Sequence, residues 1–273
     1  MSRQLMRFSV PSLADHQSAT TTKLLLLGDS GTAKTGSLIS LVQADYKLNI
    51  LDFDNGLDSL VQQIKAKCPE KMKNVNFITL RDKMKASPMG PIIDGQPKAF
   101  ITALNMLDNW KDGDINLGKP SAWGADQVLV IDSLTMMSDA AFSWAEFMNP
   151  SAKDRRQIYG AAQDAVEHVL ALLTGPGMAT NVVVIAHTKY MERPDGTMKG
   201  FPTSIGNALS PKIPAYFNSV ALATTTGAGA SLKRQIATIS TGLIDLKNPA
   251  SMKMQGILPI DTALADFFKT VRN

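Results

Sequence analysis

The residues best placed to do chemistry form one short turn: Gly28, Asp29, Ser30, Gly31, Thr32, Ala33, Lys34 and Thr35, followed by Gly36. Its spacing matches the Walker A pattern G-x-x-x-x-G-K-[ST], except that Ala33 replaces the second glycine. Backbone N–H groups of such a turn cradle phosphate oxygens. Lys34 is expected to bridge the β- and γ-phosphates, and the Thr35 hydroxyl to bind Mg²⁺. The turn therefore predicts a site for ATP and Mg²⁺, and an ordinary strand-to-helix turn is the alternative.

Ala33 carries a Cβ at a position where the backbone of this motif usually carries none. We therefore expect a negative φ at Ala33, with Gly31 supplying the conformational freedom of the turn. The departure also keeps open a scaffold that binds a nucleotide without hydrolysing it.

Two further segments place acids at the ends of predicted strands. Asp132 follows the apolar run Val128–Ile131, a Walker B layout that can hold a Mg²⁺-bound water next to Thr35. Asp52 and Asp54 end another predicted strand, and alternation puts them on the same side. Such strand ends face the nucleotide crevice of a parallel sheet, so one of the two, with Asp54 as the first choice, is predicted to be the general base for the attacking water. A helix N-cap or a solvated loop acid is the alternative.

A third strand end carries His187, directly after the apolar run Asn181–Ala186. We predict that His187 contacts the γ-phosphate and reports hydrolysis to the segment that follows. A purely structural histidine is the alternative.

Composition limits the class of protein. The chain has 273 residues, of which 44% are hydrophobic and 19% charged, so it can build a sizeable core. The formal net charge of +4 permits contact with nucleic acid without arguing for it. The single cysteine, Cys68, excludes a disulfide framework and a cysteine-rich zinc site. No apolar run approaches the ~20 residues that span a bilayer, so we expect a cytoplasmic protein with no membrane contact.

Alternating strands and helices must position the candidate groups. Apolar runs predict strands at 23–27, 48–53, 75–80, 128–131 and 181–186. The intervening patterns predict helices at 34–44, 57–67, 98–110, 134–147 and 154–173, with loops at 81–97 and 111–126. Strands at 219–225 and 234–240 predict an antiparallel extension at one sheet edge. The expected fold is an α/β domain over 23–273 with a mostly parallel sheet flanked by helices, preceded by an arm or tail over 1–22.

Taken together, the segments GDSGTAKT, LDFDNGLD, VLVIDS and VVVIAHTKY, with the later IGNAL and DLKNP, resemble the core of RecA-like P-loop ATPases. Among these the chain is most similar to bacteriophage single-strand-annealing recombination ATPases and related phage nucleotide-binding proteins. The resemblance covers about residues 23–258. It implies a water-activating acid at Asp54, where RecA-type proteins have Glu, and a γ-phosphate sensor at His187, where the family commonly has Gln.

The resemblance also implies contact with single-stranded DNA, because the family binds DNA through a flexible loop after the sensor. That loop is Lys189–Asn207 here, and basic groups on a mobile loop suit phosphate contacts. The basic candidates are Lys189, Arg193 and Lys199 in this loop, and Arg155 and Arg156 in the segment 149–159. A solvated loop and a salt-bridged helix start are the respective alternatives.

A neighbouring subunit is implied as well, because RecA-like ATPases place basic residues of one subunit against the γ-phosphate of the next. The DLKNP segment makes Lys247 the candidate, with Lys233 and Arg234 as further ones. A turn lysine before a proline is the alternative. We expect a homo-oligomer, either a filament or a ring. The arm over 1–22 can dock on that neighbour through Phe8 and Val10, or be a frayed terminus.

These expectations combine into one function. The chain is predicted to be a Mg²⁺-dependent ATPase that binds single-stranded DNA and assists homologous recombination or strand annealing. Its expected setting is a bacteriophage-infected cell, in the host cytoplasm, with a single-strand-binding protein as a candidate partner. Two alternatives stay open: an ATP-driven motor or assembly factor acting on protein, and a non-catalytic nucleotide-binding scaffold.

Overall fold

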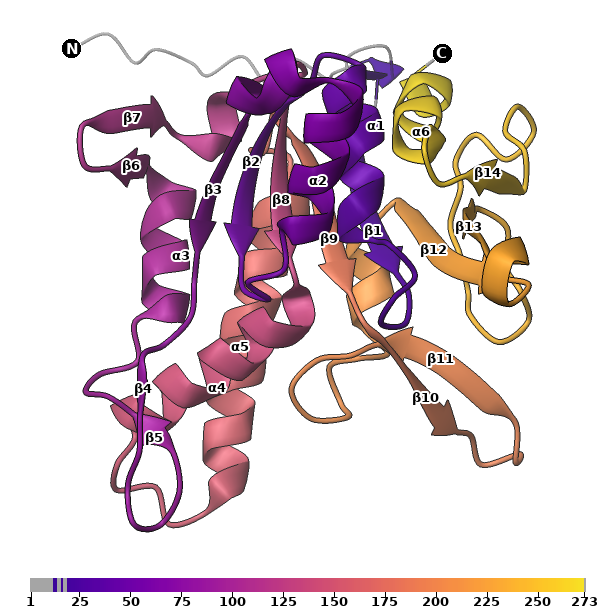
Figure 1. Cartoon of the computed structure of the whole chain (residues 1–273). Coiled ribbons are helices and arrows are strands. Elements are labelled where there is room, and N and C mark those ends of the chain that lie inside the picture. Colours follow the sequence, from indigo (N-terminus) through magenta and orange to yellow (C-terminus); the bar gives the residue numbers. More distant parts are fainter. Residues whose placement is uncertain (1–11, 14–15, 17–18, 273) are drawn as a thin grey trace, which may run out of the picture.

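The computed structural model describes residues 12–13, 16 and 19–272. Within these residues the main sheet contains eight strands, in the order β14-β13-β12-β1-β9-β8-β2-β3. The neighbours from β12 to β3 run parallel, whereas β13 and β14 add on antiparallel. The strands are β1 (Lys23–Leu27), β2 (Lys47–Asp52), β3 (Val75–Thr79), β8 (Gln127–Asp132), β9 (Asn181–Ala186), β12 (Ser219–Thr226), β13 (Lys233–Ala237) and β14 (Ile257–Pro259). The predicted α/β fold with an antiparallel C-terminal extension is confirmed (Figure 1).

Helices cover both faces of this sheet (Figure 1). One face carries α3 (Ala99–Asp108), α4 (Leu134–Met148) and α5 (Arg155–Thr174). The other carries α1 (Ile39–Gln43), α2 (Asp58–Lys67), α6 (Ala263–Arg272) and a 3₁₀ helix at Thr35–Leu38. In β1, Leu25 and Leu27 join the first core and Leu24 and Leu26 join the second. The central strands are therefore continuously apolar because both of their faces are buried.

The C-terminal helix α6 was not expected from the sequence. Its apolar residues Ala263, Leu264, Phe267 and Phe268 are all buried against the second core. They recur with helical spacing, so the signal was present in the sequence. Truncating a buried phenylalanine here would cost roughly 3–5 kcal/mol, which makes α6 part of the domain rather than an appendage.

Segments predicted as loops contain small antiparallel ribbons. The segment 81–97 contains β4 (Met84–Lys85) and β5 (Ile92–Ile93). The segment 111–126 contains β7 (Ile115–Gly118) and most of β6 (Trp110–Asp112), which starts at the last residue of the predicted helix 98–110. The predicted flexible loop Lys189–Asn207 is likewise built around a ribbon, β10 (Thr188–Glu192) paired with β11 (Met198–Pro202). The expectation of a plain loop is therefore wrong there, because backbone pairing orders most of the segment. This ribbon projects away from the sheet (Figure 1).

The last residues of the predicted N-terminal tail dock on the sheet. Thr21 and Thr22 are buried, and the backbone N–H of Thr22 donates to Asn181 Oδ1 over 2.9 Å. Phe8 and Val10 lie outside the described residues, so docking of the arm on a neighbour stays a prediction. None of the helices in the described part of the chain is long and apolar enough to cross a membrane.

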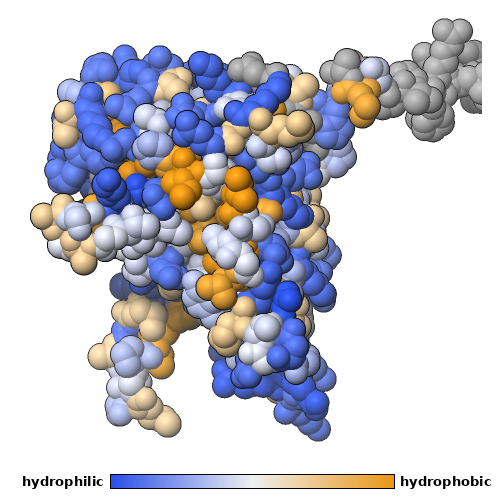
Figure 2. Space-filling model, turned by 90° about the vertical axis from the view of Figure 1, so that its right-hand side faces the viewer, coloured by the Kyte–Doolittle hydropathy of each residue, from blue (hydrophilic) through white to orange (hydrophobic). Residues whose placement is uncertain are grey.

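Apolar side chains are visible on the face that carries the C-terminal extension (Figure 2). The exposed large apolar residues of the extension are Leu232, Ile239, Leu243, Met252 and Ile257. Exposed apolar patches at the edge of a sheet are typical of surfaces that contact other molecules.

Lys23 is buried at the start of β1, with 7% of its surface exposed. Its Nζ donates to the carbonyl oxygens of Met178, over 2.6 Å, and of Thr180. Burial, with a smaller contribution from the nearby charge of Arg272, lowers the pKa of Lys23 from 10.5 to about 8.

This lowered pKa predicts a pH-dependent stability. Between pH 8 and 10.5 the folded chain binds fewer protons at Lys23 than the unfolded chain, so Lys23 makes the free energy of unfolding rise with pH across that window. We expect the difference in unfolding free energy between wild type and Lys23→Met to change by roughly 2–3 kcal/mol over the window, in favour of wild type at the higher pH. Chemical denaturation at both pH values measures it, with the exposed Lys65→Met as control. A difference that does not vary with pH would contradict the assignment.

Candidate functional site

The turn after β1 packs tightly against β12. Gly28 has φ +154°, and a Cβ there would lie 2.7 Å from the carbonyl oxygen of Ala223. Gly31 has φ +80°, as its predicted role requires. The prediction for Ala33 is wrong, however, because its φ is +66°. A left-handed residue at this point turns the chain into the following helix, and alanine tolerates the conformation at a cost of about 1–2 kcal/mol.

Lys34 is folded over the turn. Its Nζ donates to the carbonyl oxygens of Gly28 and Asp29, each over 2.8 Å. Burial lowers the pKa of Lys34, while the carboxylates of Asp132 and Asp54 oppose that shift. The ammonium group is thus held at the mouth of the turn, where it can meet phosphate oxygens with little loss of side-chain freedom.

Thr35 and Asp132 are directly joined. Thr35 Oγ1 donates to Asp132 Oδ2 over 2.6 Å, and Asp132 is 1% exposed. Burial raises the pKa of Asp132 to about 7. A hydroxyl and a carboxylate are the oxygen ligands that suit Mg²⁺ alongside nucleotide phosphates, and a bound cation would offset the cost of burying this carboxylate. The two residues therefore fit a Mg²⁺ site.

Asp54 lies just beyond β2 and is anchored on two sides. Its Oδ1 accepts hydrogen bonds from the Ser133 hydroxyl (2.7 Å) and the Ser133 backbone N–H (3.2 Å). Its Oδ2 lies 3.6 Å from His187 Nε2. Burial would raise the pKa of Asp54, but the imidazole of His187 and the two bonds from Ser133 outweigh it and hold the pKa below its usual value. Asp54 is thus kept ionised and oriented. Asp52 instead accepts from the Gly56 N–H and the Thr79 hydroxyl.

One cavity of about 480 Å³ brings these groups together. The predicted residues among those that line it are Ser30, Gly31, Ala33, Lys34, Thr35, Gly36, Asp54, Asp132, His187 and Arg234, the last of which was expected to act on a neighbouring subunit. The sheet explains this meeting, because β9 lies between β1 and β8, and β2 is next to β8. Parallel register sets Leu27 opposite Ala186, and Asp52 opposite Asp132, so the strand ends and the turns after them share one edge.

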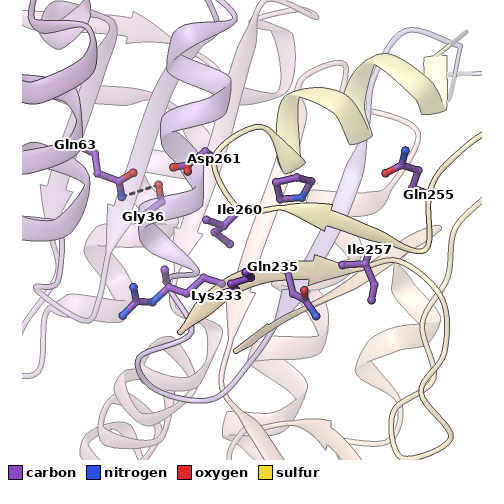
Figure 3. Close-up of a pocket in the computed structure, with 11 residues that line it drawn as sticks. Gly36, Gln63, Lys233, Gln235, Gln255, Ile257, Ile260 and Asp261 are labelled. Atoms are coloured by element: carbon purple, nitrogen blue, oxygen red, sulfur yellow. Dashed lines mark hydrogen bonds between the residues drawn. The ribbon is translucent and has the colours of Figure 1, made fainter. Parts of the chain in front are cut away.

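A second cavity of about 620 Å³ adjoins the first. It shares Ala33, Gly36, Gln63 and Arg234 with the first cavity. Figure 3 shows Gln63 reaching Gly36, where its Nε2 donates to the carbonyl oxygen over 3.2 Å. The far wall comes from the extension, with Lys233 and Gln235 on β13, Ile257 on β14, and Gln255, Ile260 and Asp261 beside them (Figure 3).

The predicted DNA-contacting residues lie outside both cavities, and many are already paired. Lys199 is 8% exposed and its Nζ contacts Asp245 Oδ1 at 2.5 Å. Lys189 Nζ donates to the Gly206 carbonyl (2.8 Å) and to Asn207 Oδ1 (3.1 Å). Arg193 is exposed at the ribbon tip, where its N–H donates to the Thr197 carbonyl.

The two arginines of the second basic segment stand at the start of α5 and are exposed. Arg155 pairs with Glu146 at 3.5 Å and Arg156 with Asp154 at 2.6 Å. Lys247, predicted to reach a neighbour, donates within its own chain to the carbonyl oxygens of Pro214 (2.7 Å) and Phe217 (3.2 Å). Its role between subunits stays a prediction.

Sequence reasoning did not find Ser133 or Gln63. Ser133 caps α4, accepting from the Met136 N–H over 3.4 Å, while its hydroxyl holds Asp54. A serine directly before an apolar helix is a recognisable N-cap, so its capping of α4 could have been predicted from the sequence, whereas its bond to Asp54 could not. Gln63 carried no signal, because its contact with Gly36 depends on how α2 packs beside the turn.

The backbone at Ala33 yields a prediction. Ala33→Gly removes the strain of the left-handed conformation but raises the conformational entropy of the unfolded chain, which offsets part of the gain. We therefore expect the unfolding free energy to rise by about 1 kcal/mol or less and the nucleotide affinity to stay the same. Ala33→Val puts a β-branched side chain at positive φ and should lower unfolding free energy by about 1–3 kcal/mol. Chemical denaturation and calorimetry with ATP measure both effects. A valine variant as stable as wild type would contradict the positive φ.

Residues 20–249 match the sequence profile of the AAA domain family AAA_24. A search of the curated proteins finds no match. Among solved structures, the KaiC-like protein of the hyperthermophilic archaeon Pyrococcus horikoshii OT3 is similar at 13% identity and a TM-score of 0.38, over 79% of this chain and 78% of that one. The flagellar accessory protein FlaH of Methanocaldococcus jannaschii is similar at 11% identity and a TM-score of 0.37, over 79% and 76% of the two chains.

Proposed function

This chain belongs to the AAA domain family, and on that premise we propose that it binds ATP with Mg²⁺ and hydrolyses it, coupling the reaction to single-stranded DNA. The observation that carries the proposal is the single cavity that gathers Lys34, the Thr35–Asp132 pair and Asp54. These groups supply a phosphate-binding cation, a Mg²⁺ site and a fixed carboxylate, which together are what phosphoryl transfer to water needs.

Each side chain has a distinct task in this reaction. Lys34 binds the β- and γ-phosphate oxygens, exchanging the carbonyl contacts that it makes over the turn. Thr35 and Asp132 hold Mg²⁺, which supplies charge neutralisation at the phosphates when bound. Asp54 orients a water for attack on the γ-phosphorus and accepts its proton as the bond to the β–γ bridging oxygen breaks. Ser133 and His187 position Asp54 for this step.

The nucleoside fits the second cavity. The phosphate cavity opens beside it at Ala33, Gly36 and Gln63, so a chain of phosphates on the turn leads there. Its volume of about 620 Å³ falls within the range of about 300–1,000 Å³ that is typical of small-molecule sites. Pro259 and Ile257 offer apolar walls, and the amides of Gln235 and Gln255 offer polar edges to a base or ribose.

Two substitutions test the ATPase proposal. Lys34→Ala should weaken ATP binding by about 10- to 100-fold and abolish turnover, because a charge-assisted phosphate contact is lost. Asp54→Asn should keep ATP binding but lower kcat by about 10²- to 10⁴-fold, because the base is removed. Calorimetry and phosphate release measure the two effects, with exposed Lys65→Ala as control. Turnover that survives Lys34→Ala would refute the site.

The proposed link to DNA runs through His187. The imidazole lies beside Asp54, and β10 begins at the next residue, Thr188. The carbonyl of His187 also accepts from the N–H of Thr203, which follows β11 at the same base of the ribbon. A change at the γ-phosphate therefore has a short covalent and hydrogen-bonded route to both strands of the ribbon. Arg193 at its tip, with Lys189 nearer its base, supplies basic groups for a phosphate backbone.

The DNA proposal predicts ATP-dependent binding that depends on the ribbon. We expect an exchange of Lys189 and Arg193 for alanine to weaken binding of a labelled oligonucleotide, while ATP turnover without DNA is unchanged. The salt dependence of binding should also become shallower by about one to two units, since up to two phosphate contacts are lost. Fluorescence anisotropy over a salt series measures this. The matched control is Lys111→Ala/Lys119→Ala, which changes two exposed lysines, one on β6 and one directly after β7.

A strand-annealing assay, together with the DNA-binding assay, separates the biological roles. Faster annealing of complementary strands with ATP supports a part in recombination or strand annealing, which is the role that we propose in a bacteriophage. Intact ATP turnover with no DNA binding at low salt would instead favour a motor or assembly factor acting on protein. Homo-oligomerisation as a filament or ring is part of the proposal, and the exposed apolar residues of the extension support it.

A further inference from the structure

We infer that Arg234 is a phosphate-binding residue that acts on the nucleotide held by its own chain. The inference rests on the proposed function and adds a phosphate-binding side chain that the sequence motifs do not contain. It also differs from the expectation that basic residues of the extension act on a neighbouring subunit.

Strand register places Arg234 above the phosphate-binding turn. Within the sheet, Leu27 at the end of β1 lies opposite Leu222 of β12. Three residues further along β12, Thr225 lies opposite Arg234 of β13. At ~3.3 Å per residue, Arg234 therefore stands about 10 Å beyond the point where β1 ends and the turn begins. The close approach of Gly28 to Ala223 shows that the turn follows β12 in that direction.

The side chain of Arg234 reaches back to this turn. Its Nε donates to the carbonyl oxygen of Gly31 over 3.3 Å. Arg234 lines the phosphate cavity together with Lys34, and it also lines the adjoining cavity. It therefore stands at the passage between the two, where the phosphate chain of a nucleotide passes.

The charge of Arg234 is not matched within the described residues, where no carboxylate lies within ion-pair distance of it. Its bond to Gly31 uses one of the five N–H donors of the guanidinium. An arginine beside a cavity that takes a polyanion is suited to bidentate binding of phosphate oxygens. By contrast, Lys247 already donates to two carbonyl groups of its own chain.

Direct binding tests the chemistry. The probes are ATP and inorganic tripolyphosphate, the second of which has the phosphates but no base or ribose. Arg234→Ala should weaken binding of both probes by the same factor, ~10- to 100-fold. Arg234→Lys should lose less affinity, because lysine keeps the positive charge. Lys269→Ala, which removes an exposed charge from α6, should bind both probes like wild type.

The outcomes separate the inference from the function on which it rests. Equal affinity of wild type and Arg234→Ala would overturn the inference alone, and so would a loss for ATP but not for tripolyphosphate, since that would mean a base or ribose contact. Wild type that binds neither probe would overturn the proposed function itself. Thermal melting without nucleotide confirms that each variant is folded.

Mixing two variants tests whether Arg234 acts within its own chain. Subunits with Arg234→Ala keep Lys34, and subunits with Lys34→Ala keep Arg234. If Arg234 serves its own chain, no site in the mixture contains both residues, and the phosphate-release rate stays at the sum of the separate variants. Recovery of turnover on mixing would show that a neighbour supplies Arg234 and would overturn the inference.

Discussion

The buried carboxylate of Asp132 is the constraint on which the site depends. A charged group with 1% of its surface exposed is costly unless hydrogen bonds or a cation compensate it. In this chain the compensation comes from Thr35, and burial still raises the pKa of Asp132 to about 7. Burial of this carboxylate costs stability, and it suits the proposed divalent cation because the Asp132 side chain is already desolvated and held in place by Thr35.

The same strand edge gives Asp54 the opposite environment. Asp132 is stabilised by one hydroxyl, whereas Asp54 receives two bonds from Ser133 and faces His187. The pKa of Asp132 is thereby raised and that of Asp54 lowered, although Asp132 ends β8 and Asp54 lies just beyond the neighbouring strand β2. Opposite environments of this kind are what the two roles proposed for these carboxyls, metal binding by Asp132 and water orientation by Asp54, would require. Ser133 connects the two, since it follows Asp132 in the chain and holds Asp54.

The C-terminal extension adds a wall to the cavities at the edge of the parallel sheet. The strands β13 and β14 form one wall of the adjoining cavity, and β13 also carries Arg234 to the turn. Ile236 of β13 and Leu258 of β14 belong to the same core cluster as Phe267 and Phe268 of α6. The edge of the sheet and the adjoining cavity therefore share the same side chains.

The sequence by itself determined the turn, the strand-end acids and the alternation of strands with helices, because these are local patterns of residue type and spacing. Lys34, Asp132 and Asp54 were identified in this way, and the cavity brings them together. Only the tertiary structure decided the positive φ of Ala33, the ribbon at 189–207, the helix α6 as part of the core, and the contacts of Ser133, Gln63 and Arg234. The physical reason is that these features depend on strand order and register. Placing β9 beside β1 sets Lys23 opposite Val182, and placing β13 beyond β12 brings Arg234 to Gly31, 203 residues away in the chain. No local pattern records which of these distant segments will meet.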